Sequence, residues 1–235
     1  MSQTFFHHVC GNTVINASGG KYNGHNTVVA PSSGRHLWKA AGAGESNSAD
    51  EGIESDDTFT LDMIDKAVEM AKTAASPVPP VNIAGNYEAG GRDIAGGKYV
   101  MYLHPYQVTD LRIDTSTGQW LDIQKAAMMG GDVSKNPIFD GSLGMYSNVI
   151  LKEANHVTQG VNSSTGAAIT TVRRAVLLGA QAGAIAFGKD NSATTYSWNE
   201  ELMDHKRILE VSTFCIWGLT KTQFDSTDFG TVVVS

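Results

Sequence analysis

The sequence is poor in the residue types that mark disulfide frameworks, rigid loops and nucleic-acid contacts. It contains 2 cysteines, 6 prolines and 17 basic residues among 235. Cys10 and Cys215 are too few for a disulfide framework and lack the spacing of a CxxC metal site, so we expect both thiols to be reduced. No apolar run approaches the ~20 residues that cross a bilayer. The first residues, MSQTFFHHVCGN, lack the basic-then-apolar order of a secretion signal, so neither a membrane partner nor export by a signal peptide is predicted.

Positive charge is scarce and scattered. The 24 acidic residues outnumber the basic ones and give a formal net charge of -7, and no basic run is longer than Arg173-Arg174. Proteins that grip nucleic acid present a clustered basic surface, so tight, direct DNA binding is not expected. Charged residues make up 17% of the chain, below the usual ~25%. A weakly charged surface is compatible with extensive burial against partners.

Apolar spacing predicts one helix clearly. Apolar residues recur at helical intervals from Leu61 to Ala71, which predicts a helix over 61–75 with Thr58 or Thr60 as its cap. A chain of this length buries roughly 70–75% of the surface that its unfolded form exposes, so it can hold a substantial core.

The remaining pattern mixes helices and strands. Helices are also predicted over 4–10 with Gly11 as the cap, in a short stretch opened by Pro105, over 119–129 and over 172–187. Strands are predicted at 99–103, 149–151, 211–222 and 229–234, with a short one at 27–30 inside a long loop at 16–57, and 82–98 and 158–167 are expected to be loops. Because helices and strands do not alternate strictly, the predicted class is α+β rather than doubly wound α/β.

Two histidines are the strongest candidates for catalysis. His104 ends a predicted strand, where a general base could stand, and His205 follows Asp204, a carboxylate that could orient an imidazole. Sequence neighbours rarely face each other, and His7 and His8 are adjacent and therefore point to different faces. The chain has no HExxH, GxSxG or GK[ST] motif. We assign no catalytic, cofactor-binding or metal-binding residue, and keep a small hydrolase or metal-dependent enzyme using His104 or His205 as an alternative.

Residues 135–157 form the most organised stretch of the chain. The sequence KNPIFDGSLGMYSNVILKEANHV runs from a polar loop through a glycine-bearing turn into a short apolar strand. A strand that follows a rigid loop positions that loop accurately. This arrangement suits an active site and a subunit contact equally well, and both interpretations stay open.

Five blocks in constant order give the chain a family resemblance. They are HPYQVTDLR (104–112), WLDIQKAA (120–127), the stretch 135–157, RAVLLGAQA (174–182) and WGLTKTQFDSTDFGTVVVS (217–235). Together they cover most of residues 100–235, and in them the chain resembles the major capsid proteins of tailed bacteriophages, in particular the branch of N-four-like phages and many prophages. The segments FFHHVCGN and LDMIDKA fit the same family more loosely.

The resemblance implies a structural role. Members of this family have a Hong Kong 97-type fold with axial and peripheral domains, and they build an icosahedral shell of hexamers and pentamers around double-stranded DNA. The expected location is the virion capsid, after synthesis in the bacterial host cytoplasm. The expected partners are further copies of the chain, with scaffold, portal or decoration proteins as further candidates and DNA enclosed without specific binding. No catalytic residue is implied. A nanocompartment shell protein, which shares this fold, stays an alternative.

The resemblance also predicts a domain division. Residues 1–57 are expected to be a remnant of the peripheral domain with a long loop, 58–206 the axial domain, and 207–235 the returning peripheral strands. The loop at 82–98 is a candidate intersubunit loop.

A departure from the family pattern gives one further expectation. Before a segment like TFFHHVCGN, family members carry an N-terminal arm, an extended loop and most of a long helix, whereas this sequence begins inside that region. We therefore expect an N-terminally truncated fold with uncovered apolar surface on the peripheral strands, which predicts association or poor solubility.

Overall fold

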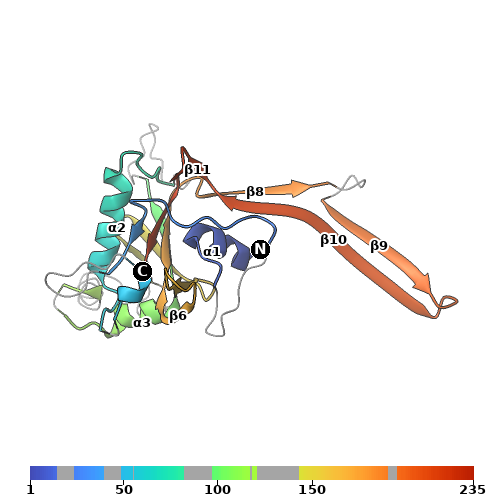
Figure 1. Ribbon diagram of the computed structural model, residues 1–235, viewed down its shortest axis with the longest axis horizontal. Coiled ribbons are helices and arrows are strands. Elements are labelled where there is room, and N and C mark those ends of the chain that lie inside the picture. Colours follow the sequence, from blue (N-terminus) through green and yellow to red (C-terminus); the bar gives the residue numbers. More distant parts are fainter. Residues whose placement is uncertain are drawn as a thin grey trace, which may run out of the picture.

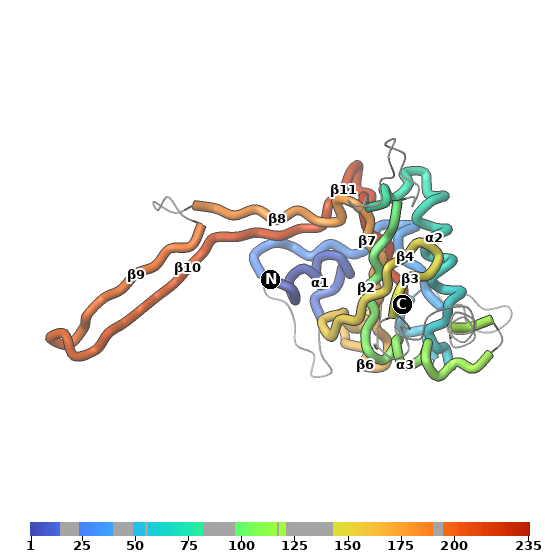
Figure 2. The backbone as a smooth tube through the Cα atoms, turned by 180° about the vertical axis from the view of Figure 1, so that it is seen from behind, coloured from blue at the N-terminus to red at the C-terminus, as the bar shows by residue number. Residues whose placement is uncertain are grey.

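Two parts make up the fold: a body built on a six-stranded sheet, and a long β-arm that projects from it (Figures 1 and 2). The computed structural model describes residues 1–14, 24–39, 49–54, 56–81, 97–116, 118–120, 143–189 and 195–235. Both chain ends lie in or beside the body (Figure 1).

The elements mix helices and strands along the chain. The helices are α1 (Ser2–Cys10), the short 3₁₀ helix η1 (Asp50–Gly52), α2 (Leu61–Thr73) and α3 (Pro105–Ile113). The body sheet has the order β1-β13-β7-β2-β4-β3, formed by β1 (His36–Leu37), β13 (Thr231–Val234), β7 (Ala175–Leu178), β2 (Tyr99–Leu103), β4 (Val149–Glu153) and β3 (Met145–Tyr146). Two small ladders flank it, formed by β5 (Gln159–Val161) with β6 (Ala168–Arg173) and by β11 (Gln223–Phe224) with β12 (Thr227–Asp228). The arm consists of β8 (Gly183–Gly188), β9 (Tyr196–Met203) and β10 (Ile208–Lys221).

The core lies on both faces of the body sheet. Strands β7 and β13 are buried along their whole length, and successive side chains of a strand point to opposite faces. Leu177 therefore joins the cluster beneath α2, whereas Val176 joins the cluster beneath α1. The sheet is thus held between α2 on one face and α1 on the other.

Most local predictions are confirmed, including the α+β class. Helix α1 ends at Gly11, whose φ of 62° is left-handed, and α2 begins at Leu61 as expected. Strand β2 has the predicted bounds, α3 opens at Pro105, and the strands predicted at 149–151, 211–222 and 229–234 correspond to β4, β10 and β13. The predicted helix over 119–129 and the loop at 82–98 fall largely outside the described residues.

Three local predictions are wrong. Residues 172–187 form no helix: they contribute to β6, β7 and β8. An apolar run inside a central strand has no period-2 pattern, so it looks like a buried helix in the sequence, and pairing of β7 with β2 and β13 overrides helix propensity. Residues 27–30 belong to no strand, since the strand of that region is His36–Leu37, and the loop expected at 158–167 contains β5.

Asp50 connects four separate segments of the body. Its buried carboxylate accepts hydrogen bonds from Arg174 Nε at 2.8 Å, the Val161 amide at 3.0 Å and Trp38 Nε1 at 3.2 Å, and Arg174 Nη2 lies 2.7 Å away. Arg174 Nη1 in turn donates to the carbonyls of Cys10 and Gly11. Burial favours a raised pKa for Asp50, but the charge of Arg174 and the hydrogen bond from Val161 outweigh it and lower the pKa. The carboxylate is therefore charged and fully paired.

Replacing this carboxylate should destabilise the whole body. We expect Asp50→Asn to lower the free energy of unfolding by about 3–5 kcal/mol, because it leaves the buried Arg174 without its counter-charge. Urea denaturation followed by circular dichroism measures the change. Asp56→Asn, at an exposed carboxylate, is the matched control and should change stability by less than about 0.5 kcal/mol. Equal stability of the two variants would contradict the role of Asp50.

Candidate assembly surface

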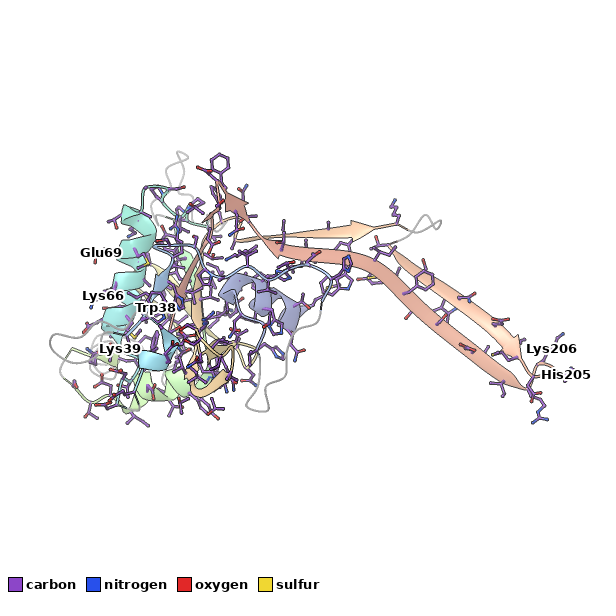
Figure 3. All side chains as sticks on the ribbon, in the orientation of Figure 1. Trp38, Lys39, Lys66, Glu69, His205 and Lys206 are labelled. Carbon is purple, nitrogen blue, oxygen red and sulfur yellow. The ribbon has the colours of Figure 1, made fainter. Side chains whose placement is uncertain are left out.

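The arm is a two-stranded ribbon along its length. Strand β10 pairs with β9 from Ile208 to Cys215 and with β8 from Ile216 to Lys221. The distal turn holds three successive residues with positive φ, at 48°, 55° and 70° for Asp204 to Lys206. The arm reaches far beyond the body, and its distal turn carries the labelled His205 and Lys206 (Figure 3).

One side of the arm is almost entirely apolar. Side chains alternate along a strand, so every second residue of β10 shares a face with the residues paired to it. Among the paired residues of β8, β9 and β10, Glu200 is the single charged residue on this side between Phe187 and the distal turn, and Thr213 also lies on this side. We call it the aromatic face, and it comprises Phe187, Tyr196, Trp198, Leu202, Leu209, Val211, Cys215 and Trp217. Trp198 and Tyr196 are 66% and 62% exposed.

The opposite side of the arm is interrupted by polar groups. Glu201 lies directly opposite Glu210, and Asn199 lies opposite Ser212. Two like charges in register repel each other, and neither pair offers apolar surface. Exposed apolar side chains on this side flank the two polar pairs, with Met203 and Ile208 towards the distal turn and Phe214 and Ile216 towards the body. The aromatic face therefore has fewer polar interruptions than the opposite side and carries the exposed Tyr196 and Trp198.

Among the described residues, the body covers the aromatic side of β10 only at its base. Leu219 and Lys221 are buried there, and a Cβ on Gly183 would lie 3.7 Å from the ring of Phe5 in α1. Lys221 Nζ lies 2.9 Å from an oxygen of the buried Asp228. Burial lowers the pKa of Lys221, and the hydrogen bond and charge of Asp228 oppose that shift. The Lys221–Asp228 ion pair thus fixes the base of the arm to the body, beside α1.

The sequence predicted part of this surface. Apolar side chains are exposed along the arm, and the strand expected at 211–222 corresponds to β10, which runs over Ile208–Lys221. The distal residues of β10 are exposed. Strand β9 was not predicted, although the alternation of Tyr196 and Trp198 with polar residues indicates a strand.

The structure keeps the candidate histidines apart. His104 is buried in the body and caps α3, because its Nδ1 accepts from the Tyr106 amide at 3.2 Å and its own amide donates to Gln107 Oε1 at 3.0 Å. His205 lies exposed in the distal turn of the arm (Figure 3). Burial, with a contribution from the charge of Arg173, lowers the pKa of His104 to about 4. The two imidazoles are therefore too far apart to act in one active site, and the structure gives the enzyme hypothesis no support at these residues.

His7 and His8 are buried in the body and contribute to the fold. His7 Nδ1 lies 2.9 Å from the carbonyl of Asn12 in the interior, and His8 is buried beside it. Within the described ranges, no group of histidine, cysteine or acidic side chains is arranged to hold a metal ion. The described part of the stretch 135–157 forms β3, a turn at Ser147-Asn148, and β4 of the body sheet.

Comparison with known proteins gives the family. The family model described as "Phage capsid protein" matches residues 1–235. The chain belongs to this family. Membership favours a structural protein over an enzyme. A search of curated proteins finds no match. No helix in the described part of this capsid-family chain is long and apolar enough to span a bilayer.

Solved capsids share the fold of this capsid-family chain. The capsid of Ralstonia phage GP4 is 26% identical with a TM-score of 0.68, and the match covers 99% of this chain and 62% of that one. The capsid of cyanophage Pam1 is 18% identical with a TM-score of 0.66 over the same shares. The acidic stable capsid of Helicobacter pylori bacteriophage KHP30 is 15% identical with a TM-score of 0.59, covering 99% and 65%. The Hong Kong 97-type fold is thereby confirmed, and the chain spans less than two thirds of the length of these relatives.

The buried His104 should make stability depend on pH. Folding lowers the pKa of His104 from the ordinary 6.5 to about 4. Between pH 4 and pH 6.5 the imidazole is therefore protonated in the unfolded chain but neutral in the folded chain. The contribution of the neutral His104 to the free energy of unfolding is fully present above pH 6.5 and is lost as the pH falls towards 4. We expect His104→Asn, which keeps a capping acceptor but cannot titrate, to flatten the decline of the unfolding free energy over this range.

Urea titrations at several pH values measure this slope. His205→Asn at the exposed turn is the matched control and should leave the slope unchanged. An unaltered slope in His104→Asn would show that this imidazole does not contribute to the decline.

Proposed function

We propose that the chain is a shell subunit, a major capsid protein that acts by self-association into the hexamers and pentamers of an icosahedral phage capsid. The observation that carries the proposal is the family match over residues 1–235. The projecting arm with its aromatic face supports it, because exposed apolar patches of this size mark interaction surfaces. The virion capsid is the corresponding location, and synthesis takes place in the bacterial host cytoplasm.

The domain division stays a prediction, and strand pairing suggests how to refine it. The boundary expected between 206 and 207 falls in the turn between β9 and β10, which form one hairpin. Strand β13, expected with the peripheral segment 207–235, lies inside the body sheet. We therefore propose that the arm at 183–221 together with α1 represents the peripheral domain, and that the rest of the body represents the axial domain.

The proposed relation to DNA is enclosure without specific contacts. The net charge of -7 opposes phosphate binding, and the cationic Arg174 and Lys221 are paired with carboxylates inside the body. An acidic container repels packaged phosphates, so the DNA can move as it is packed. Scaffold, portal and decoration proteins stay candidate partners.

Assembly tests the proposed function directly. We expect the purified 25.0 kDa chain to sediment as multiples of its own mass and to form rings or shells in negative-stain micrographs. A stable monomer under all conditions, with hydrolytic activity in a general substrate screen, would instead favour the enzyme alternative. A cargo enzyme encoded beside the gene, in place of portal and terminase genes, would favour a nanocompartment.

DNA binding supplies a second test. At physiological ionic strength we expect no shift of double-stranded DNA in a gel mobility assay, because the chain lacks a clustered basic surface. If a shift occurs, a Lys206→Glu variant tells whether the exposed basic turn of the arm causes it, and a salt-sensitive shift in both forms would contradict enclosure without binding.

A further inference from the structure

We draw no further inference here: the strongest candidate, the pocket that Arg35 lines between the end of α2 and the β11–β12 ladder, indicates no ligand, because Arg35 Nη1, which has no hydrogen-bond partner in the described part of the chain, is itself buried, and Asp225 together with the C-terminal end of α2 disfavours an anion there.

Discussion

The body depends on one buried charge pair. Asp50 belongs to a three-residue 3₁₀ helix that brings little apolar surface, yet it is held in the interior by the guanidinium of Arg174. Through that contact, the loop carrying Trp38, strand β5 and the end of α1 are fixed relative to β7. Desolvating both ions is costly, so the pair specifies an arrangement more than it adds stability. Because α1 is held in place, it can pack against the base of the arm.

A buried ion pair also fixes the base of the arm, but there little apolar burial accompanies it. Lys221 and Asp228 form a buried ion pair at the base, and from there outward the hydrogen-bonded ribbon leaves the body and loses its packing. Cross-strand hydrogen bonds keep the shape, but apolar burial, the main favourable contribution to folding, is missing over the distal part. In the described residues this leaves a large apolar surface exposed, and such surfaces are typical of interaction sites.

Sequence reasoning succeeded where local physics decides and failed where long-range pairing decides. The helix from Leu61 and the cap at Gly11 follow from spacing and backbone freedom, and both are present. Ala175–Leu178 was expected to be helical, because only its neighbours in the sheet make it a strand. The sequence predicted uncovered apolar surface on peripheral strands but not the aromatic face itself. Its composition depends on the register between Trp198 and Thr213, which no single segment encodes. His104, named from the sequence as a candidate for catalysis, caps α3 in the structure, because its side chain accepts a hydrogen bond from the backbone of the following turn.

The length of β10 gives the arm a mechanical property. The strand has 14 residues and is fixed at one end by the buried Lys221, so it acts as a lever about 45 Å long. A tilt of about 5° at the base displaces the distal turn by roughly 4 Å over that length, close to the spacing between neighbouring strands. A small change in the orientation of the body would therefore become a shift of several ångströms at the distal turn. Such a shift is large enough to change which residues the distal turn contacts.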